Sequence, residues 1–339
     1  MHTAVNPNCQ IYYSGTYWND FHPVQEYICE NLTGDKKKQW VEDFRERFAK
    51  KPFEHGLFLN CGNGWVEREF LDKKIIKQAT GFDYSMYFLS LADKERGPRP
   101  IHYFQTDVNK VIFKENRFDI IVNVAALHHV QFINRLCRIL CNALKTEGLF
   151  VNFDYVGPHR NQYSFMNWIL INLVNRSLSP AVRKSPLVKP HLPTMLYTDP
   201  TEAIHSELIF KTLSNYFDII ERYDTGGGIA YEILTHNRKI KNVPAQELNP
   251  QIEKILRIDK KLSDWKLVPP LFSYFIAKPR KAILHDKKTL AYHQNLEDQR
   301  EAWAGRHSGT YSLKEFMSAV ILKNLRPRLL RLSKHLKWR

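Results

Sequence analysis

Residues 56–67 have the sequence Gly-Leu-Phe-Leu-Asn-Cys-Gly-Asn-Gly-Trp-Val-Glu, which predicts a strand, a glycine turn and a helix in succession. The apolar run 57–59 is typical of a buried strand, and a helical pattern begins near Trp65. Gly62 and Gly64 lie in the turn, where a side chain would keep a ligand away from the backbone N–H groups that open the helix. The stretch therefore predicts a loop that can hold a nucleotide-like ligand.

An acidic residue ends the next predicted strand, at residues 78–83. Asp83 lies 19 positions after Gly64, close to the spacing at which a carboxylate reaches a ribose diol in doubly wound sheets. A dinucleotide loop would carry a third glycine, but Glu67 stands in its place and would repel a pyrophosphate. The spacing thus indicates a ribose-bearing ligand and disfavours NAD and FAD.

Three more strands are predicted, at residues 103–108, 117–124 and 148–154. The middle one is apolar on both faces, as a central parallel strand should be. In this order the motifs resemble those of the class I S-adenosylmethionine-dependent methyltransferases. The residues that carry the resemblance are the loop Cys61-Gly62-Asn63-Gly64, Asp83, Asp107, Phe118-Asp119-Ile120-Ile121 and Leu144-Lys145-x-x-Gly148.

The resemblance implies an α/β fold with a Rossmann-like, seven-stranded, doubly wound sheet whose last strand is antiparallel. It also implies S-adenosyl-L-methionine as the cofactor, with its methionine part on the glycine loop, its ribose on Asp83 and its adenine near Asp107 and Val108. Tyr84 would lie beside the adenine, and Ala125 near the sulfonium carbon. The cofactor-binding residues that it implies are Asn60, Cys61, Gly62, Gly64, Asp83, Tyr84, Asp107, Val108 and Ala125.

Two positions of the loop depart from the family pattern. Asn60 replaces the first glycine, and Phe58 replaces the acid often found two positions before it. Asparagine tolerates a left-handed backbone better than most residues, so the loop can still form. If the ligand site had been lost, the chain would be a catalytically inactive, methyltransferase-like binding or scaffold protein, and this alternative stays open.

The 339 residues are predicted to form one methyltransferase domain with additions. We expect an N-terminal helical cap at 1–50, the domain at 51–280 and a basic amphipathic helical tail at 281–339. A lid inserted at about 155–210 is also expected, because loops at the carboxyl ends of parallel strands line the ligand crevice. Further strands are predicted at 217–223 and 269–279.

Two local patterns lie in and after the lid. The run Asp199-Pro200-Thr201-Glu202 predicts the start of a helix, with Asp199 as its N-cap. The run Gly226-Gly227-Gly228 lacks the Lys-Ser/Thr of a phosphate loop, so it predicts a flexible turn that opens onto the crevice.

Methyl transfer to an oxygen is helped by a base that takes the acceptor's proton. The candidate catalytic residues follow the fourth and fifth strands and are His128, Asp154 and His159. Of the adjacent His128 and His129, only one is expected to point inward, and the resemblance favours His128. No group of His, Cys or carboxylate residues has the sequence spacing of metal ligands, so no catalytic metal is expected.

The net charge of +15 is unevenly distributed. Residues 286–339 hold 12 Lys and Arg against 5 Asp and Glu. Residues 311–339 alternate leucine and basic faces at helical spacing, which fits packing on the body or a protein partner first, a membrane surface second and nucleic acid third. The five cysteines form no Cys-x-x-Cys pair. With no secretory leader, they indicate a cytoplasmic protein, peripheral at the membrane if the tail anchors it.

As far as Pro279 the chain resembles a bacterial branch of small-molecule methyltransferases that are often associated with sugar or secondary-metabolite modification. We therefore expect an S-adenosylmethionine-dependent methyltransferase that O-methylates a sugar-like or secondary-metabolite small molecule. The alternatives are an RNA methyltransferase, suggested by the basic charge, and the inactive scaffold protein.

Overall fold

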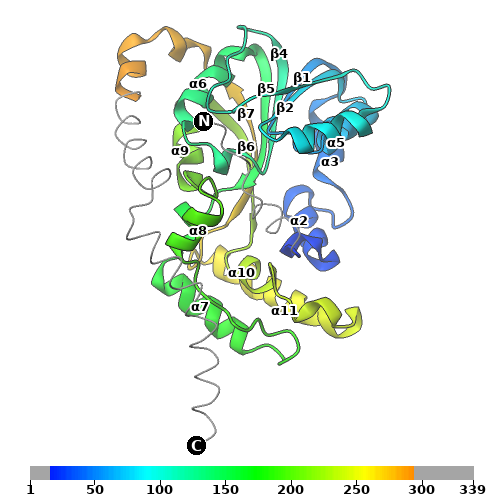
Figure 1. The fold of residues 1–339 in the computed structure, drawn as a ribbon, viewed down its shortest axis with the longest axis vertical. Helices are drawn as coiled ribbons and strands as arrows, with labels where there is room; N and C mark the ends of the chain where they lie inside the picture. Colours follow the sequence, from blue (N-terminus) through cyan, green and yellow to red (C-terminus); the bar gives the residue numbers. More distant parts are fainter. Residues whose placement is uncertain (1–15, 294–339) are drawn as a thin grey trace, which may run out of the picture.

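The computed structural model describes residues 16–293, with the side chains of residues 197 and 198 excepted. The amphipathic pattern predicted at 311–339 lies outside the described residues. Seven strands form one sheet in the order β3-β2-β1-β4-β5-β7-β6 (Figure 1). They are β1 Phe53–Leu59, β2 Ile76–Asp83, β3 Ile101–Gln105, β4 Phe118–Val124, β5 Leu144–Tyr155, β6 Phe217–Gly226 and β7 Phe272–Pro279.

The direction of the strands confirms the predicted doubly wound sheet with an antiparallel last strand. Strand β1 pairs in parallel with β2 and β4, β2 pairs in parallel with β3, and β4 pairs in parallel with β5. Strand β7 is antiparallel to both of its neighbours, β5 and β6. The prediction for the third strand was too long, because β3 ends at Gln105 and leaves Asp107 in the loop that follows.

Two helical layers cover the two faces of the sheet. Helices α3 (Trp40–Phe48) and α4 (Trp65–Asp72) supply Phe44 and Phe70 to a cluster with Phe58 of β1. On the other face, α6 (Ile133–Ala143) and α9 (Ile209–Leu213) pack against Leu57 and Phe150. Alternating residues of β1 thus serve opposite cores, which is the period-2 pattern of a strand buried on both sides. Helices α2 (His22–Thr33) and α5 (Met86–Arg96) lie beside the strands at the two edges.

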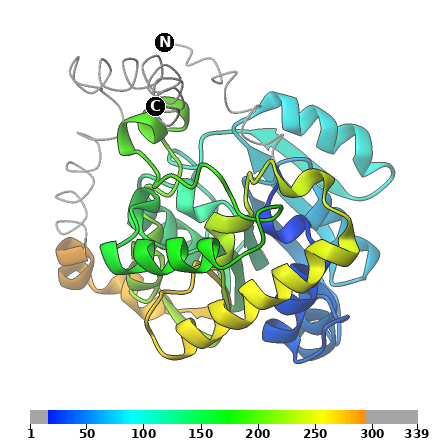
Figure 2. The ribbon, with the colours of Figure 1, turned by 90° about the horizontal axis from the view of Figure 1, so that it is seen from below.

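A third layer lies beyond one end of the sheet. It contains α7 (Phe165–Arg176), α10 (Ala230–Leu234) and α11 (Ala245–Asp264), which share one apolar cluster. Tyr155, the last residue of β5, packs in the same cluster, so this layer covers the carboxyl ends of the parallel strands. Figure 2 looks onto α7 and α11 from this side. The short helix α8 (Leu192–Thr198) lies between this layer and the sheet (Figure 1).

The helix predicted to start at Asp199 is wrong. Asp199 instead ends α8, and its Oδ1 accepts hydrogen bonds from the backbone N–H (3.0 Å) and hydroxyl (2.8 Å) of Thr201. The bond from the N–H of Thr201 is one that a helix N-cap also makes, but residues 200–203 form turns and Ala203 has a φ of +50°, which an α-helix does not allow.

The triple glycine is not an open, flexible turn. Gly226, Gly227 and Gly228 are buried. The N–H groups of Gly227, Ile229 and Ala230 all donate to the carboxylate of Asp259, at 2.9, 2.6 and 3.1 Å. A side chain from α11 therefore fills the position that a ligand anion would need. None of the helices in residues 16–293 combines the length and the apolar character needed to cross a membrane.

Candidate functional site

The loop after β1 adopts the left-handed backbone that its residues allow. The φ angles are +42° at Asn60, +56° at Gly62 and +72° at Gly64. A Cβ built on Gly62 would meet no atom within 4 Å, whereas a Cβ on Gly64 would collide with the hydroxyl of Tyr103. Gly62 therefore leaves open space above the loop, while Gly64 is needed for packing beneath it.

Asp83 lies directly against this loop. Its Oδ2 accepts the N–H of Gly62 at 2.9 Å, and its Oδ1 accepts the N–H of Ser85 at 2.8 Å. Burial raises the pKa of Asp83, although these N–H groups favour the charged form. The prediction that the loop and this carboxylate converge is thus supported by a direct contact between them.

The other residues expected around the adenosine lie on neighbouring loops. The N–H of Thr106 donates to the carbonyl of Asp83 at 3.1 Å, which brings the segment after β3 beside the end of β2. In that segment Oδ1 of Asp107 accepts a hydrogen bond from the N–H of Asn109 at 2.9 Å. The side chain of Val108 is buried in the core. The ring of Tyr84 is 47% exposed and is available to flank a ligand.

Ala125 follows β4 and has a φ of +52°, an unusual backbone conformation for a residue with a Cβ. Its N–H is held by the carbonyl of Phe153 at 2.8 Å. Strained backbone of this kind is concentrated at functional sites. Ala125 opens the segment that carries the two histidines, 128 and 129.

Asp154 and His128 form a buried pair at the ends of β5 and β4. The Nδ1 of His128 lies 2.5 Å from the Oδ1 of Asp154. The other carboxylate oxygen accepts from the N–H of Leu127 at 2.6 Å and from the side chain of Asn123 at 2.7 Å. Asp154 is therefore fixed by its own partners, and it fixes the ring of His128 with Nε2 directed away from the sheet.

Electrostatics within this pair favour the ion pair. Burial disfavours the charged imidazolium, but the adjacent Asp154 carboxylate outweighs it and raises the pKa of His128. The pKa of Asp154 lies below its usual range for the same reason, despite its burial. With its pKa raised to about 9, His128 is protonated at neutral pH, and its neutral form, a stronger base than a free imidazole, is populated only as the pH approaches 9.

Both histidines point toward the same carboxylate, so the expectation that only one of them points inward is wrong. The Nε2 atoms of His128 and His129 each lie 3.8 Å from Oε2 of Glu202. The Nδ1 of His129 contacts the hydroxyl of Thr201 at 3.1 Å. Sequence reasoning missed Glu202 because it follows His129 by 73 positions and only the fold brings them together.

The third candidate, His159, contacts the backbone of Ile204, whose N–H in turn donates to the carbonyl of His128 at 2.9 Å. The Nδ1 of His159 lies 2.5 Å from the carbonyl oxygen of Ile204. The neighbouring Arg160 is buried, and its guanidinium donates to the carbonyl oxygens of Pro200 and Glu202. Both side chains thus hold the segment that carries Glu202.

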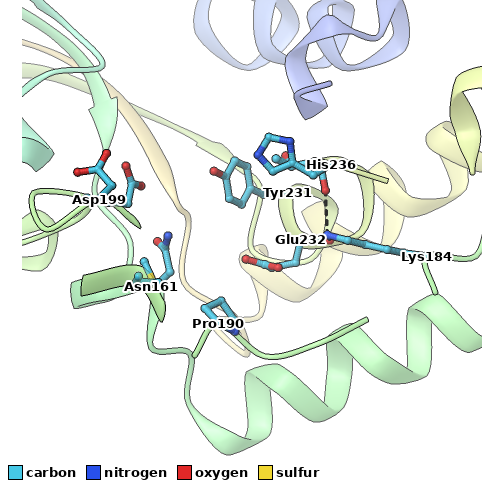
Figure 3. A pocket seen from close by; sticks show the side chains of 10 residues that line it. Asn161, Lys184, Pro190, Asp199, Tyr231, Glu232 and His236 are labelled. Atoms are coloured by element: carbon cyan, nitrogen blue, oxygen red, sulfur yellow. Dashed lines mark hydrogen bonds between the residues drawn. The ribbon is translucent and has the colours of Figure 1, made fainter. Parts of the chain in front are cut away.

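A cavity of about 170 Å³ lies next to Glu202. Figure 3 shows Asp199 and Asn161 on one side of it, with Glu232, Lys184 and His236 on the other and Tyr231 between them. Lys184 donates to the backbone carbonyls of Glu232 and Thr235. Burial lowers the pKa of Lys184 and raises that of Glu232. Asp199, Glu202 and Glu232 bring three carboxylates to a cavity whose surface is mostly apolar.

Residues 57–152 match the family model for a methyltransferase domain. This match, which runs from β1 to β5, and the strand order indicate a methyltransferase domain with S-adenosyl-L-methionine as its cofactor. The fold is similar to that of an S-adenosylmethionine-dependent methyltransferase from Mesorhizobium loti, at 18% identity and a TM-score of 0.43 over 70% of this chain and 96% of that one. It is also similar to the [4+2]-cyclase SpnF, at 14% identity and a TM-score of 0.44 over 80% and 96%. The comparison with curated proteins gave no match.

The residues around the loop fit this cofactor. The space above Gly62 can admit part of the cofactor, because a Cβ built there would meet no atom within 4 Å. Asp83 can accept hydrogen bonds from a ribose diol, and the exposed ring of Tyr84 can lie against a base. Glu67, which stands where a third glycine would be in a dinucleotide loop, is completely buried beneath the loop and leaves the space above it free.

Proposed function

We propose that this methyltransferase methylates a hydroxyl oxygen of a small, sugar-like or secondary-metabolite acceptor held in the cavity beside Glu202. The observation that carries this proposal is the buried Asp154–His128 pair at the ends of two adjacent strands, between the cofactor loops and that cavity. A hydroxyl is favoured as the acceptor because its methylation releases a proton, and the pair provides a place for it.

The catalytic step follows from the orientation of the pair. When bound, S-adenosylmethionine supplies an electrophilic methyl group for in-line displacement by the acceptor oxygen. In the fraction of molecules in which His128 is neutral, its Nε2 accepts the acceptor's proton. Asp154 keeps the ring in the tautomer with its proton on Nδ1 and stabilises the imidazolium that forms.

The cavity also supports a class of acceptor. Asp199, Glu202, Glu232 and Asn161 offer several hydrogen-bond acceptors, which suits a molecule with many hydroxyls or with an amine. Two cations near the cavity already donate hydrogen bonds to backbone carbonyls. Arg160 donates to those of residues 200 and 202, and Lys184 donates to those of residues 232 and 235. This arrangement disfavours anionic acceptors, including the phosphates of RNA.

The test is methylation of a metabolite extract with isotope-labelled S-adenosylmethionine, followed by mass spectrometry. The labelled product should gain one methyl group on oxygen. His128→Asn should lower the rate of its formation by about 10²–10⁴-fold, the range for loss of a general base. Binding of S-adenosylhomocysteine, measured by calorimetry, should change little and serves as the control for folding.

The variant His159→Ala tests the other histidine that was predicted to be catalytic. Because its Nδ1 contacts the carbonyl of Ile204, its loss should disturb the segment that carries Glu202 and reduce the rate less than His128→Asn does. A larger loss in His159→Ala than in His128→Asn, at equal cofactor affinity, would transfer the role of base to His159. A product methylated on nitrogen or carbon would refute O-methylation.

A further inference from the structure

We propose that His128, His129 and Glu202 form a binding site for a divalent transition-metal ion of the Zn²⁺ type, at the opening of the cavity. The binding of the ion rests on these side chains alone. Its effect on catalysis rests on the proposed function, because one of the three ligands is the histidine assigned there as the proton acceptor.

The distances between the ligand atoms suit a single ion. One ring nitrogen of His128, one of His129 and one carboxylate oxygen of Glu202 all lie within 4.8 Å of one another. The same carboxylate oxygen is 3.8 Å from each of the two nitrogens. Around a tetrahedral Zn²⁺ with bonds of about 2.0–2.1 Å, ligand atoms are separated by roughly 3.3 Å. Small rotations of the side chains would therefore bring all three atoms into coordination.

Each of the three ligands is held in place by a second contact. Asp154 lies 2.5 Å from Nδ1 of His128, and the hydroxyl of Thr201 lies 3.1 Å from Nδ1 of His129. The backbone carbonyl of Glu202 accepts from the guanidinium of Arg160 at 3.3 Å. Metal-binding histidines usually donate their other ring N–H to a carboxylate or another oxygen, which fixes the ring and increases its basicity. Both rings here have such an arrangement.

The donor set indicates the kind of ion. Two imidazole nitrogens and one carboxylate form a set used by catalytic zinc sites, which keep a fourth position open for water or substrate. Nitrogen donors favour Zn²⁺ and its neighbours in the series over Mg²⁺ and Ca²⁺, which prefer oxygen. Since Glu202 also lines the cavity, the open position would face the acceptor. Sequence spacing did not reveal this set, because Glu202 belongs to a segment far from the histidines.

An ion at this site excludes the proposed proton transfer. Nε2 of His128 has one lone pair, which can bind either a metal ion or a proton. A loaded enzyme therefore lacks its proton acceptor, and methyl transfer should fall in proportion to the occupied fraction. Removal of the ion by a chelator should restore the rate.

The binding test uses Co²⁺ and the full chain without a polyhistidine tag, after treatment with EDTA. Titration should give one Co²⁺ per chain with the visible absorption of a four-coordinate ion, and Zn²⁺ should displace it. His129→Ala and Glu202→Gln should each weaken Co²⁺ binding at least 10-fold. Exposed His102, on β3, provides the matched control, since His102→Ala should bind Co²⁺ as the native chain does. Equal Co²⁺ affinity in all four proteins would overturn the site.

The rate of methylation distinguishes the two proposals. Inhibition by Zn²⁺ that follows occupancy and is reversed by EDTA supports both of them. Stimulation by Zn²⁺ would leave the metal site standing and would refute the role of His128 as proton acceptor. Absence of Co²⁺ binding, with an inactive His128→Asn variant, would refute the metal site alone.

Discussion

Two glycine turns in this chain are each backed by a buried carboxylate, yet only one of them can serve a ligand. In the turn at 226–228, Asp259 accepts three backbone N–H groups and fills the turn from within. In the loop at 60–64, Glu67 lies beneath the backbone, and neither of its oxygens has a hydrogen-bond partner among the described residues. The comparison teaches that a glycine turn becomes a ligand site when the protein's own side chains leave its outer face open.

The largest loss of stability is expected on substitution of Asp259, because both oxygens of its carboxylate accept hydrogen bonds. Asp259→Ala would leave three buried N–H donors without a partner. At about 1–3 kcal/mol for each unsatisfied donor, the free energy of unfolding should fall by about 3–9 kcal/mol. Urea denaturation measures this change. Asp259→Asn, which keeps one acceptor oxygen, should lose less. An unchanged midpoint in Asp259→Ala would mean that the turn does not depend on Asp259.

Glu67, whose carboxylate oxygens have no hydrogen-bond partner among the described residues, should make the free energy of unfolding depend on pH. Burial raises the pKa of Glu67 to about 7, while an unfolded glutamate has a pKa of about 4.3. Cys61, Tyr103, Asp83 and Arg68 are the ionisable groups whose charges act on it. A raised carboxyl pKa favours the folded state at low pH, and this contribution is lost as the pH rises from about 4.3 to 7.

The native chain should therefore lose stability over this pH range relative to Glu67→Gln, which cannot ionise. The difference should approach about 3 kcal/mol at pH 7.5, since each pKa unit corresponds to about 1.4 kcal/mol. Urea denaturation of both proteins at pH 5, 6 and 7.5 measures it. Parallel curves across this range would show that Glu67 has an ordinary pKa in the folded protein.

The smallest losses of stability are expected for Gly64→Ala and Gly62→Ala, the two glycine substitutions in the loop at 60–64, and the two variants should differ. In Gly64→Ala the new methyl group meets the hydroxyl of Tyr103, and the positive φ adds about 1–2 kcal/mol of strain, so stability should fall by about 2–3 kcal/mol. The second substitution Tyr103→Phe should recover part of that loss. Gly62→Ala carries the backbone strain alone, because its methyl group meets no atom within 4 Å.

Gly62→Ala should instead weaken binding of S-adenosylhomocysteine, because its methyl group projects into the space proposed for the cofactor. Calorimetric titration should show a loss of about 10-fold or more, equivalent to 1.4 kcal/mol. The opposite pattern, with Gly64→Ala weakening binding and Gly62→Ala only destabilising the fold, would reverse the roles assigned to the two glycines.

The elements at residues 53–83, where we place the cofactor, were well predicted because the sequence patterns that indicate them are local. The strand, glycine turn and helix at 53–72 follow one another in the chain, and Asp83 ends the next strand at a spacing fixed by the length of α4. Parallel strands align their carboxyl ends at one edge, so the order of motifs places the loop and this carboxylate together. The contact between Gly62 and Asp83 is the result.

The region that we propose to bind the acceptor was predicted less well. His128 and Asp154 were found as separate candidates, and only the register of β4 on β5 pairs them. A helix was expected to start at Asp199, but a turn is found there. These outcomes depend on contacts across the third layer, which no local pattern encodes.

The sequence by itself determined where the parallel strands lie along the chain, the glycine loop and the acid that ends β2, because hydrophobic period and backbone conformation depend on near neighbours along the chain. Tertiary structure decided which glycine turn stays open, since Asp259 reaches residue 227 from 32 positions away. It also decided that Glu202 joins His128 and His129. Contacts between distant segments depend on how the layers pack, and packing becomes defined only when the whole chain is folded.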